Sequence, residues 1–375
     1  MSNYLPLNGI KVCDIAQGIA GPYAAMLLAQ YGADVVKIEP DSGDWVRNMG
    51  GRIHGDQSAQ SLSTNRGKRS VVLDLKSQEG KAAALKLASE ADIVTQSFRP
   101  GVIERLGLDY ESVKSVNPNV IYLSISGFGP VGPLSKRPAT DAILQAFTGL
   151  QSITRDKDGS PMRVGMAIID YITGLYAYQA VATALIARDK GMGGRKLDIS
   201  LMESAMAVQA GQFVRHHAQG GQPPANGVPV GTFETTTGFI NLSANRPDHF
   251  EKVCDALGLS ELKSRPEFST HSDRIWRATE INALLAPTLK TKSAEHWINF
   301  FAELGLMCAP VHEYGDVLAN EHVKTAGTFS WPDQPGLGPI PVPQPPGIAR
   351  LEDNDPRGLS PDVGQHTDEI ILGLK

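Results

Sequence analysis

Asp170 is the side chain whose surroundings in the sequence best suit covalent chemistry. It follows the apolar run GMAII and precedes the apolar stretch 171–188, which we expect to be a helix buried in the core. A carboxylate at the start of such a helix lies near free backbone amides and the positive end of the helix dipole, which keep it ionised. A partly desolvated carboxylate is also a better nucleophile than a solvated one. Local evidence alone favours a simple helix cap, so the catalytic interpretation depends on burial.

Cationic side chains gather near the expected strand ends, which is where ligands of open α/β sheets bind. They are Arg66, Lys68, Arg69, Arg99, Arg105, Lys136 and Arg137. Each of them taken alone is more simply explained as surface charge. The loop of Gly18 and Gly21 lacks the GxGxxG spacing of dinucleotide binders, which disfavours NAD as a ligand.

We expect no metal site. His216 and His217 are adjacent, so their side chains point in different directions, and no carboxylate completes an HExxH motif. Cys13, Cys254 and Cys308 are scattered singly, without the CxxC pairs of a zinc or redox centre. An odd number of isolated cysteines suits a reducing compartment, and we expect a cytoplasmic protein.

The charge and hydropathy patterns exclude two further classes of partner. The 375 residues carry a formal net charge of -5 with no basic block, which argues against nucleic acid. No apolar run approaches the length that crosses a bilayer, and the first residues do not resemble a signal peptide, so we expect no membrane association.

Alternating strands and helices predict a parallel sheet covered on both faces, that is, a Rossmann-like α/β fold. Residues 9–40 read as a strand, a loop, a helix from about Pro22 and a second strand that ends near Glu39. The same rhythm continues with strands expected at 70–75, 91–98 and 120–128 and a helix at 77–90.

Two proline-rich stretches divide the chain. The first, 220–231, reads as a linker, and the second, 332–346, reads as an extended strap that leads to a final helix near Asp368. We therefore predict a large α/β domain formed by 1–219 and about 332–375, and a small α+β domain formed by about 220–331.

Six segments, in order over nearly the whole chain, resemble the class III CoA-transferases of the CaiB/BaiF family. They are the stretch 9–40, NRGKRSVVLDLKSQEG, FRPGVIERLGLDY, NPNVIYLSISGFGPVGP, GMAIIDYITGLYA and GQHTDEI. The resemblance implies that Asp170 is the nucleophile and passes through an aspartyl anhydride and an aspartyl-CoA thioester. It also implies an interlocked homodimer, with coenzyme A and acyl-CoA as substrates and no permanently bound cofactor.

The resemblance further implies which residues contact coenzyme A. Ile19 would lie near its reactive end, and the other contacts would be Leu73, Lys76, Ser97, Phe98, Arg105 and Arg137. Relatives often have an arginine near the adenine of coenzyme A at the place of Pro40, so we do not expect that adenine contact here. Formyl-CoA transferases have a glutamine at the place of Ile19, so oxalate and formate are disfavoured and a larger acid is expected.

The leading hypothesis is transfer of coenzyme A from succinyl-CoA or another dicarboxylyl-CoA, with Arg163 or Arg215 as the partner of a distal carboxylate. An alternative is a 2-methylacyl-CoA racemase or isomerase. Racemases of the family have a histidine directly before the aspartate that is Asp141 here, and this chain has Thr140 there, which removes a second base. A third possibility is a non-catalytic CoA-binding protein in which Asp170 is only a helix cap.

Overall fold

The computed structural model describes residues 5–156, 158–220, 227–348 and 350–374. They form two compact units, Met1–Gly211 with Gly327–Lys375, and Gln212–Ala326. Residues 221–226, inside the expected linker, lie outside the described part of the chain. Within the described ranges, no helix is long and apolar enough to cross a membrane.

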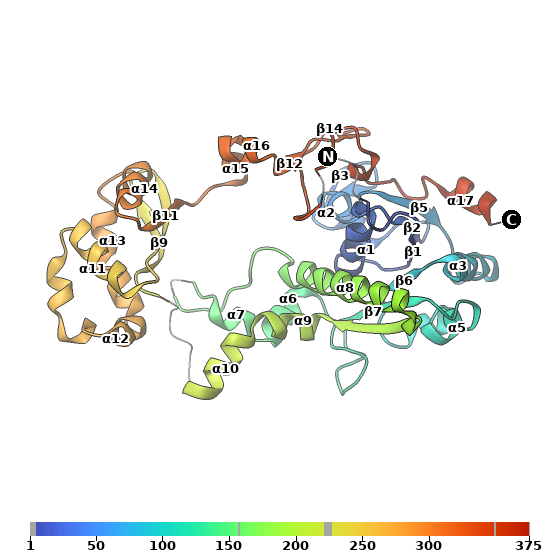
Figure 1. The fold of residues 1–375 in the computed structure, drawn as a ribbon, viewed down its shortest axis with the longest axis horizontal. Helices are drawn as coiled ribbons and strands as arrows, with labels where there is room; N and C mark the ends of the chain where they lie inside the picture. The colour runs from blue at the N-terminus through green and yellow to red at the C-terminus, as the bar shows by residue number, and fades with distance from the viewer. Residues whose placement is uncertain (1–4, 157, 221–226, 349, 375) are drawn as a thin grey trace. The chain divides into compact units, whose positions relative to one another are not determined.

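The first unit is built on a six-stranded sheet in which every neighbouring pair of strands is parallel (Figure 1). In spatial order the strands are β5 (Lys68–Val72), β2 (Asp34–Glu39), β1 (Lys11–Asp14), β6 (Ile93–Gln96), β7 (Ile121–Ser126) and β8 (Arg195–Ser200). The predicted parallel α/β sheet is confirmed. The chain builds outward from β1 in one direction and then returns to its other side with β6, so β1 and β6 flank the point where the strand order reverses.

Neighbouring residues of the strands belong to two separate cores, one on each face of the sheet. Val12 and Ile93 pack in a core with helices α1 (Ala20–Gln30) and α8 (Ile168–Ala187). Cys13 and Val94 pack in a second core with α3 (Gln78–Glu90) and α5 (Tyr110–Val116). This alternation is what a sheet covered by helices on both faces requires.

Helices α1 and α8 cross closely at Gly174. A Cβ atom there would lie 2.8 Å from the Ala20 carbonyl oxygen, so only glycine fits. The expectation that this apolar helix is buried in the core holds for only one of its faces in the single chain. Its face toward α1 is buried, but the side chains of Leu175 and Ile186 are 50% and 59% exposed.

The carboxyl-terminal segment covers the free edge of the sheet at β5. Thr367 Oγ1 accepts the Val72 amide at 3.0 Å, His366 Nδ1 accepts the Ser70 amide at 3.2 Å, and the Gly67 amide donates to the Leu359 carbonyl oxygen at 2.8 Å. Backbone groups of an edge strand that would otherwise be unpaired therefore have partners.

Shorter elements complete the first unit. They are a 3-10 turn at Trp45–Asn48, β3 (Arg52–His54), β4 (Gln57–Ser58), α2 (Ala59–Thr64), α4 (Val102–Leu106), α6 (Asp141–Phe147), α7 (Leu150–Ile153), α9 (Leu201–Val208), β12 (Phe329–Ser330), β13 (Asp333–Gln334), β14 (Gly338–Pro339), β15 (Val342–Pro343) and α17 (Thr367–Gly373). The strap predicted at 332–346 thus contains short paired strands, and the final helix is present.

The second unit has an antiparallel sheet of three strands, β11 (Met307–Pro310), β10 (Gly238–Ser243) and β9 (Val230–Thr235). Its core contains Phe233, Ile240, Phe250 and Phe301. The helices are α11 (Pro247–Ala256), α12 (His271–Trp276), α13 (Ala278–Leu289), α14 (Ala294–Glu303), α15 (Tyr314–Ala319) and α16 (Glu321–Ala326), and α10 (Ala210–Gln219) spans the boundary between the units.

Candidate active site

A cavity of about 850 Å³ lies at the carboxyl ends of four strands of the parallel sheet. Its lining includes Ile19 after β1, Ser97 after β6, Gly127 after β7 and Leu201 after β8. Because β1 and β6 flank the reversal in strand order, the cavity occupies the position at which open α/β sheets bind their ligands.

The two loops at this reversal are joined by paired hydrogen bonds. Ser97 Oγ accepts the amide of Gln17 at 2.8 Å and donates to the Gln17 carbonyl oxygen at 2.9 Å. Next to them Gly18 has φ +85°, and a Cβ atom there would lie 2.6 Å from the Trp45 ring. The close approach of Trp45 therefore requires glycine at this position.

Two buried ion pairs stabilise the end of β1 and the loop that follows it. Lys68 Nζ donates to Asp14 Oδ2 at 2.8 Å, and Lys37 Nζ donates to Asp44 Oδ2 at 2.9 Å. Asp44 Oδ1 in turn accepts the Gly18 amide at 3.0 Å. Burial opposes ionisation of Asp14, but the ammonium groups of Lys68 and Lys37 hold its pKa below the ordinary value. The sequence alone does not indicate that these buried charges form pairs.

Asp170 is the third residue of α8 and lines the cavity. It is partly buried, and the described residues offer its carboxylate no hydrogen bond. Burial raises the pKa of Asp170 to about 7, and the nearby negative charge of Asp141 adds to the rise. The site thus holds a carboxylate that is unusually basic and unpaired, two properties of a nucleophile.

The expectation that helix amides keep Asp170 ionised is wrong. The first amides of α8 are taken by Asp141, whose Oδ2 accepts the amides of Ile169 at 2.6 Å and Asp170 at 3.1 Å. Asp141 therefore caps the helix from another element, and Asp170 does not cap it. The helix terminus faces Asp141 and not the Asp170 carboxylate, and burial together with the negative charge of Asp141 raises the pKa of Asp170.

Gln145 connects Asp141 to the loop that leads into α8. Its Nε2 donates to Asp141 Oδ1 at 2.5 Å and to the Met166 carbonyl oxygen at 3.2 Å, and its Oε1 accepts the Val164 amide at 2.8 Å. One glutamine therefore fixes both the aspartate that holds the helix terminus and the backbone beside Arg163.

Seven of the eleven residues given a catalytic, coenzyme A or substrate role from the sequence line this one cavity. They are Ile19, Ser97, Phe98, Arg137, Thr140, Arg163 and Asp170. They come from loops that are far apart in the sequence and meet because the strands that carry them are parallel.

The other four lie elsewhere. Leu73 is in the core next to α3, and Lys76 is exposed in the turn after β5. Arg105 is exposed on α4, whose Val102 does line the cavity. Arg215 is on the part of α10 that belongs to the second unit.

The lining also contains residues that sequence reasoning did not single out, among them Trp45, Met49, Gln60 and Ser126. Tyr171 OH donates to Gln60 Oε1 at 2.9 Å, which orients that amide. A turn residue such as Trp45 carries no local pattern that indicates a ligand site, since only the packing of its loop brings it to the cavity.

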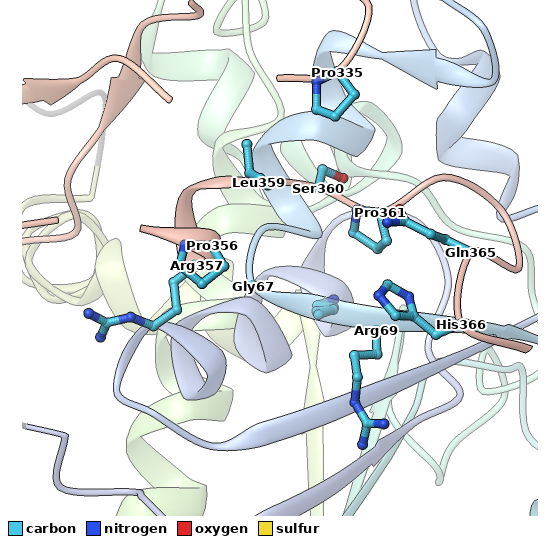
Figure 2. Close-up of a pocket in the computed structure, with 11 residues that line it drawn as sticks. Gly67, Arg69, Pro335, Pro356, Arg357, Leu359, Ser360, Pro361, Gln365 and His366 are labelled. Carbon is cyan, nitrogen blue, oxygen red and sulfur yellow. The ribbon is translucent and has the colours of Figure 1, made fainter. Parts of the chain in front are cut away.

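A smaller cavity of about 280 Å³ lies at the β5 edge, under the carboxyl-terminal segment (Figure 2). Its basic side chains are already engaged. Arg69 pairs with Asp34 at 2.7 Å, Arg357 pairs with Asp355 at 2.6 Å, and Lys68 pairs with Asp14. In Figure 2 the guanidinium groups of Arg69 and Arg357 extend away from the cavity. Its cations are thus occupied, in contrast to those of the larger cavity.

Comparison with known proteins agrees with the resemblance stated from the motifs. The sequence model of CoA-transferase family III matches residues 7–367. A succinyl-CoA:glutarate CoA-transferase from Homo sapiens is 32% identical, over 99% of this chain and 86% of that protein. A succinate–glutarate CoA-transferase from Agrobacterium fabrum is 31% identical, over 99% of this chain and 96% of that protein.

Solved structures match over a similar extent. The crystal structure of a CaiB/BaiF family protein from Brucella suis aligns with a TM-score of 0.85 and 31% identity, covering 99% of this chain and 100% of that one. An aspartate-to-alanine mutant of Rv3272 from Mycobacterium tuberculosis aligns with a TM-score of 0.85 and 29% identity, covering 99% of each chain. The chain belongs to CoA-transferase family III and is a CoA-transferase.

Proposed function

We propose that the protein moves coenzyme A from a dicarboxylyl-CoA donor, such as succinyl-CoA, to a carboxylic acid acceptor, with Asp170 as the nucleophile. The observation that carries this proposal is the unpaired Asp170 carboxylate, with its pKa near 7, on the wall of the 850 Å³ cavity. Relatives named as succinyl-CoA:glutarate and succinate–glutarate CoA-transferases support the choice of dicarboxylic acids.

The first half of the reaction transfers coenzyme A to the enzyme. A carboxylate oxygen of Asp170 attacks the thioester carbonyl of the donor, the C–S bond breaks, and a mixed anhydride and CoA thiolate form. The thiolate then attacks the Asp170 carbonyl carbon. The C–O bond breaks, the donor acid leaves as a carboxylate, and an aspartyl-CoA thioester remains.

The second half reverses these steps with the acceptor acid. The acceptor carboxylate attacks the aspartyl thioester and displaces the thiolate, which gives a second anhydride. The thiolate attacks the acceptor carbonyl and releases the new acyl-CoA, so that Asp170 is again a free carboxylate. No electrons are gained or lost, and the residues need only to bind coenzyme A, exclude water and stabilise the oxyanions.

Coenzyme A is a substrate in this scheme and not a resident cofactor. We propose that its reactive end lies at Ile19, Ser97 and Phe98, which line the cavity with Asp170. Leu73, Lys76 and Arg105 follow or lie near strand ends on the same edge of the sheet, outside this cavity, and would contact more distant parts of the molecule. Thr140 stands in the cavity where a racemase would need a base, which supports transfer.

We propose that the active form is a homodimer. Leu175 and Ile186 of α8 and Val208 of α9 are between 50% and 59% exposed in the single chain. Apolar exposure of this kind on core helices supports a partner surface. Sedimentation equilibrium should give twice the mass of one chain, and a monomer at micromolar concentration would contradict this proposal.

We also propose a cytoplasmic location, because the free thiols Cys13, Cys254 and Cys308 suit a reducing compartment.

The test of the nucleophile is mass spectrometry of the intact protein after incubation with a panel of acyl-CoAs and trapping with hydroxylamine or borohydride. The wild type should carry an adduct, or its trapped derivative, that maps to Asp170, and Asp170→Ala should carry none. Asp189→Asn is the matched control, because Asp189 is exposed just beyond the far end of α8. An adduct on another residue, or turnover by Asp170→Ala, would disprove the proposal.

A further inference from the structure

We propose that Arg163 selects dicarboxylic acids by pairing with the carboxylate at the far end of the acyl group that Asp170 carries. This inference rests on the acyl transfer proposed above and assigns the substrate class to one side chain.

The first observation is an excess of unpaired positive charge. Three arginines, Arg99, Arg137 and Arg163, line the large cavity, and all three are exposed. Among the residues that the structure describes, none makes a side-chain hydrogen bond or ion pair with any of them. Asp141, the other carboxylate of the lining, is already occupied by two amides and Gln145. The cavity is therefore complementary to a ligand with several negative groups.

The second observation is that the arginines and the nucleophile line the same cavity without pairing with each other. Burial and the charge of Asp141 raise the pKa of Asp170, and no arginine acts to lower it. The guanidinium groups thus share the cavity with Asp170 without neutralising it. A substrate with a second carboxylate would bring a partner for one of these cations while its other carboxyl group reacts at Asp170.

Among the three, the backbone anchoring favours Arg163. Arg163 lies in the loop that leads directly into α8, and the neighbouring Val164 amide is held at 2.8 Å by Gln145 Oε1. The same glutamine fixes Asp141, which holds the Asp170 amide. The backbones of Arg163 and Asp170 therefore share one rigid support, as a group that measures the length of an acyl chain requires. Arg99 and Arg137 lie with Phe98 and Ser135 on loops that we assign to coenzyme A.

The experiment compares acceptor acids of equal chain length, succinate with butyrate and glutarate with pentanoate, and uses one acyl-CoA donor. In Arg163→Met, kcat/KM for the dicarboxylates should fall about 10- to 100-fold, which is the usual range for a lost charge-assisted hydrogen bond, while the values for the monocarboxylates stay within about 3-fold. Arg163→Lys keeps the charge and should recover part of the preference. Arg99→Met is the comparison variant and should leave the dicarboxylate-to-monocarboxylate ratio as in the wild type.

The results separate this inference from the transfer itself. An equal fall in kcat/KM for both kinds of acid in Arg163→Met would overturn the role of Arg163. So would a loss of the dicarboxylate preference in Arg99→Met while Arg163→Met keeps the wild-type preference. In either case the trapped adduct on Asp170 would still form. Absence of any adduct in the wild type would instead remove the proposed function on which the inference rests.

Discussion

The carboxylate of Asp141 accepts the main-chain amide of Asp170 at 3.1 Å, so two acidic residues meet at the start of one helix. Asp141 takes the amides that could have stabilised the Asp170 carboxylate and adds a negative charge beside it. The free amides at the start of α8 can donate hydrogen bonds to only one of these two carboxylates. Burial raises the pKa of Asp170, and the adjacent charge of Asp141 raises it further.

The rate of acyl transfer should rise with pH through about 7. The nucleophile is the ionised form of Asp170, and its pKa is raised to about 7 by burial and by Asp141. Single-turnover formation of the trapped adduct, followed from about pH 5.5 to 9, should increase to a plateau above about pH 8. A rate that is constant over this range would show that ionisation of Asp170 does not limit the reaction.

Asp141→Asn should move the midpoint of this pH profile toward acid. The substitution removes the like charge near Asp170, which lowers the pKa of Asp170, and it retains an oxygen that can accept the Ile169 and Asp170 amides. The plateau rate should fall as well, since a less basic carboxylate is a weaker nucleophile. Asp189→Asn serves as the control and should keep the wild-type midpoint. A midpoint that moves toward alkali would contradict the role given to Asp141.

Asp170→Asn should stabilise the fold at alkaline pH. The folded-state pKa of Asp170 lies above the ordinary value of 3.8, so the protonated form contributes stability below that value, and this contribution is lost as pH rises through about 7. A rise from 3.8 to about 7 corresponds to about 4 kcal/mol at most, and water in the cavity reduces this to roughly 1–3 kcal/mol.

Urea unfolding of wild type and Asp170→Asn at two pH values measures this difference. The variant should gain free energy of unfolding at pH 8 and little or none at pH 4.5. An equal gain at both values would point to better packing of the amide, and a loss at pH 8 would mean that the ionised carboxylate is well stabilised.

Lys68→Met should destabilise the first unit strongly. Lys68 and Asp14 are both fully buried and pair at 2.8 Å, so the substitution leaves a carboxylate without its cation. Breaking such a pair costs roughly 3–5 kcal/mol. Differential scanning calorimetry should show a lower transition temperature for Lys68→Met and a smaller loss for the double variant Lys68→Met with Asp14→Leu. Equal losses in the two variants would mean that the ion pair does not explain the effect.

Local patterns sufficed to predict the α/β fold and much of the candidate site. The alternation of apolar strands and helices indicated the parallel sheet, and five of its six strands fall within or next to the expected ranges. The boundaries shifted by a few residues, as at β5, which begins at Lys68 because its pairing with β2 extends beyond the apolar residues. Ile19, Phe98 and Asp170, which were named from their positions in the motifs, all line one cavity.

The exposed face of α8 shows where periodicity fails. A helix that is apolar on most sides reads as buried, but whether each side is covered depends on which elements reach it. The described part of the chain leaves the side chains of Leu175 and Ile186 at least half exposed. Leu73 is buried in the core next to α3, so its proposed contact with coenzyme A stays a prediction that motif position alone supports.

The sequence by itself determined the family, the parallel sheet and the aspartate at the start of α8, because these depend on residue types and spacing along a short stretch of chain. The tertiary structure alone decided the electrostatics of that aspartate. Asp141 and Gln145 reach the helix terminus from α6, and Lys68 pairs with Asp14 across strands that are not neighbours in the sheet. A pKa depends on charges and burial within a few ångströms in space, and the linear sequence does not specify which groups those are.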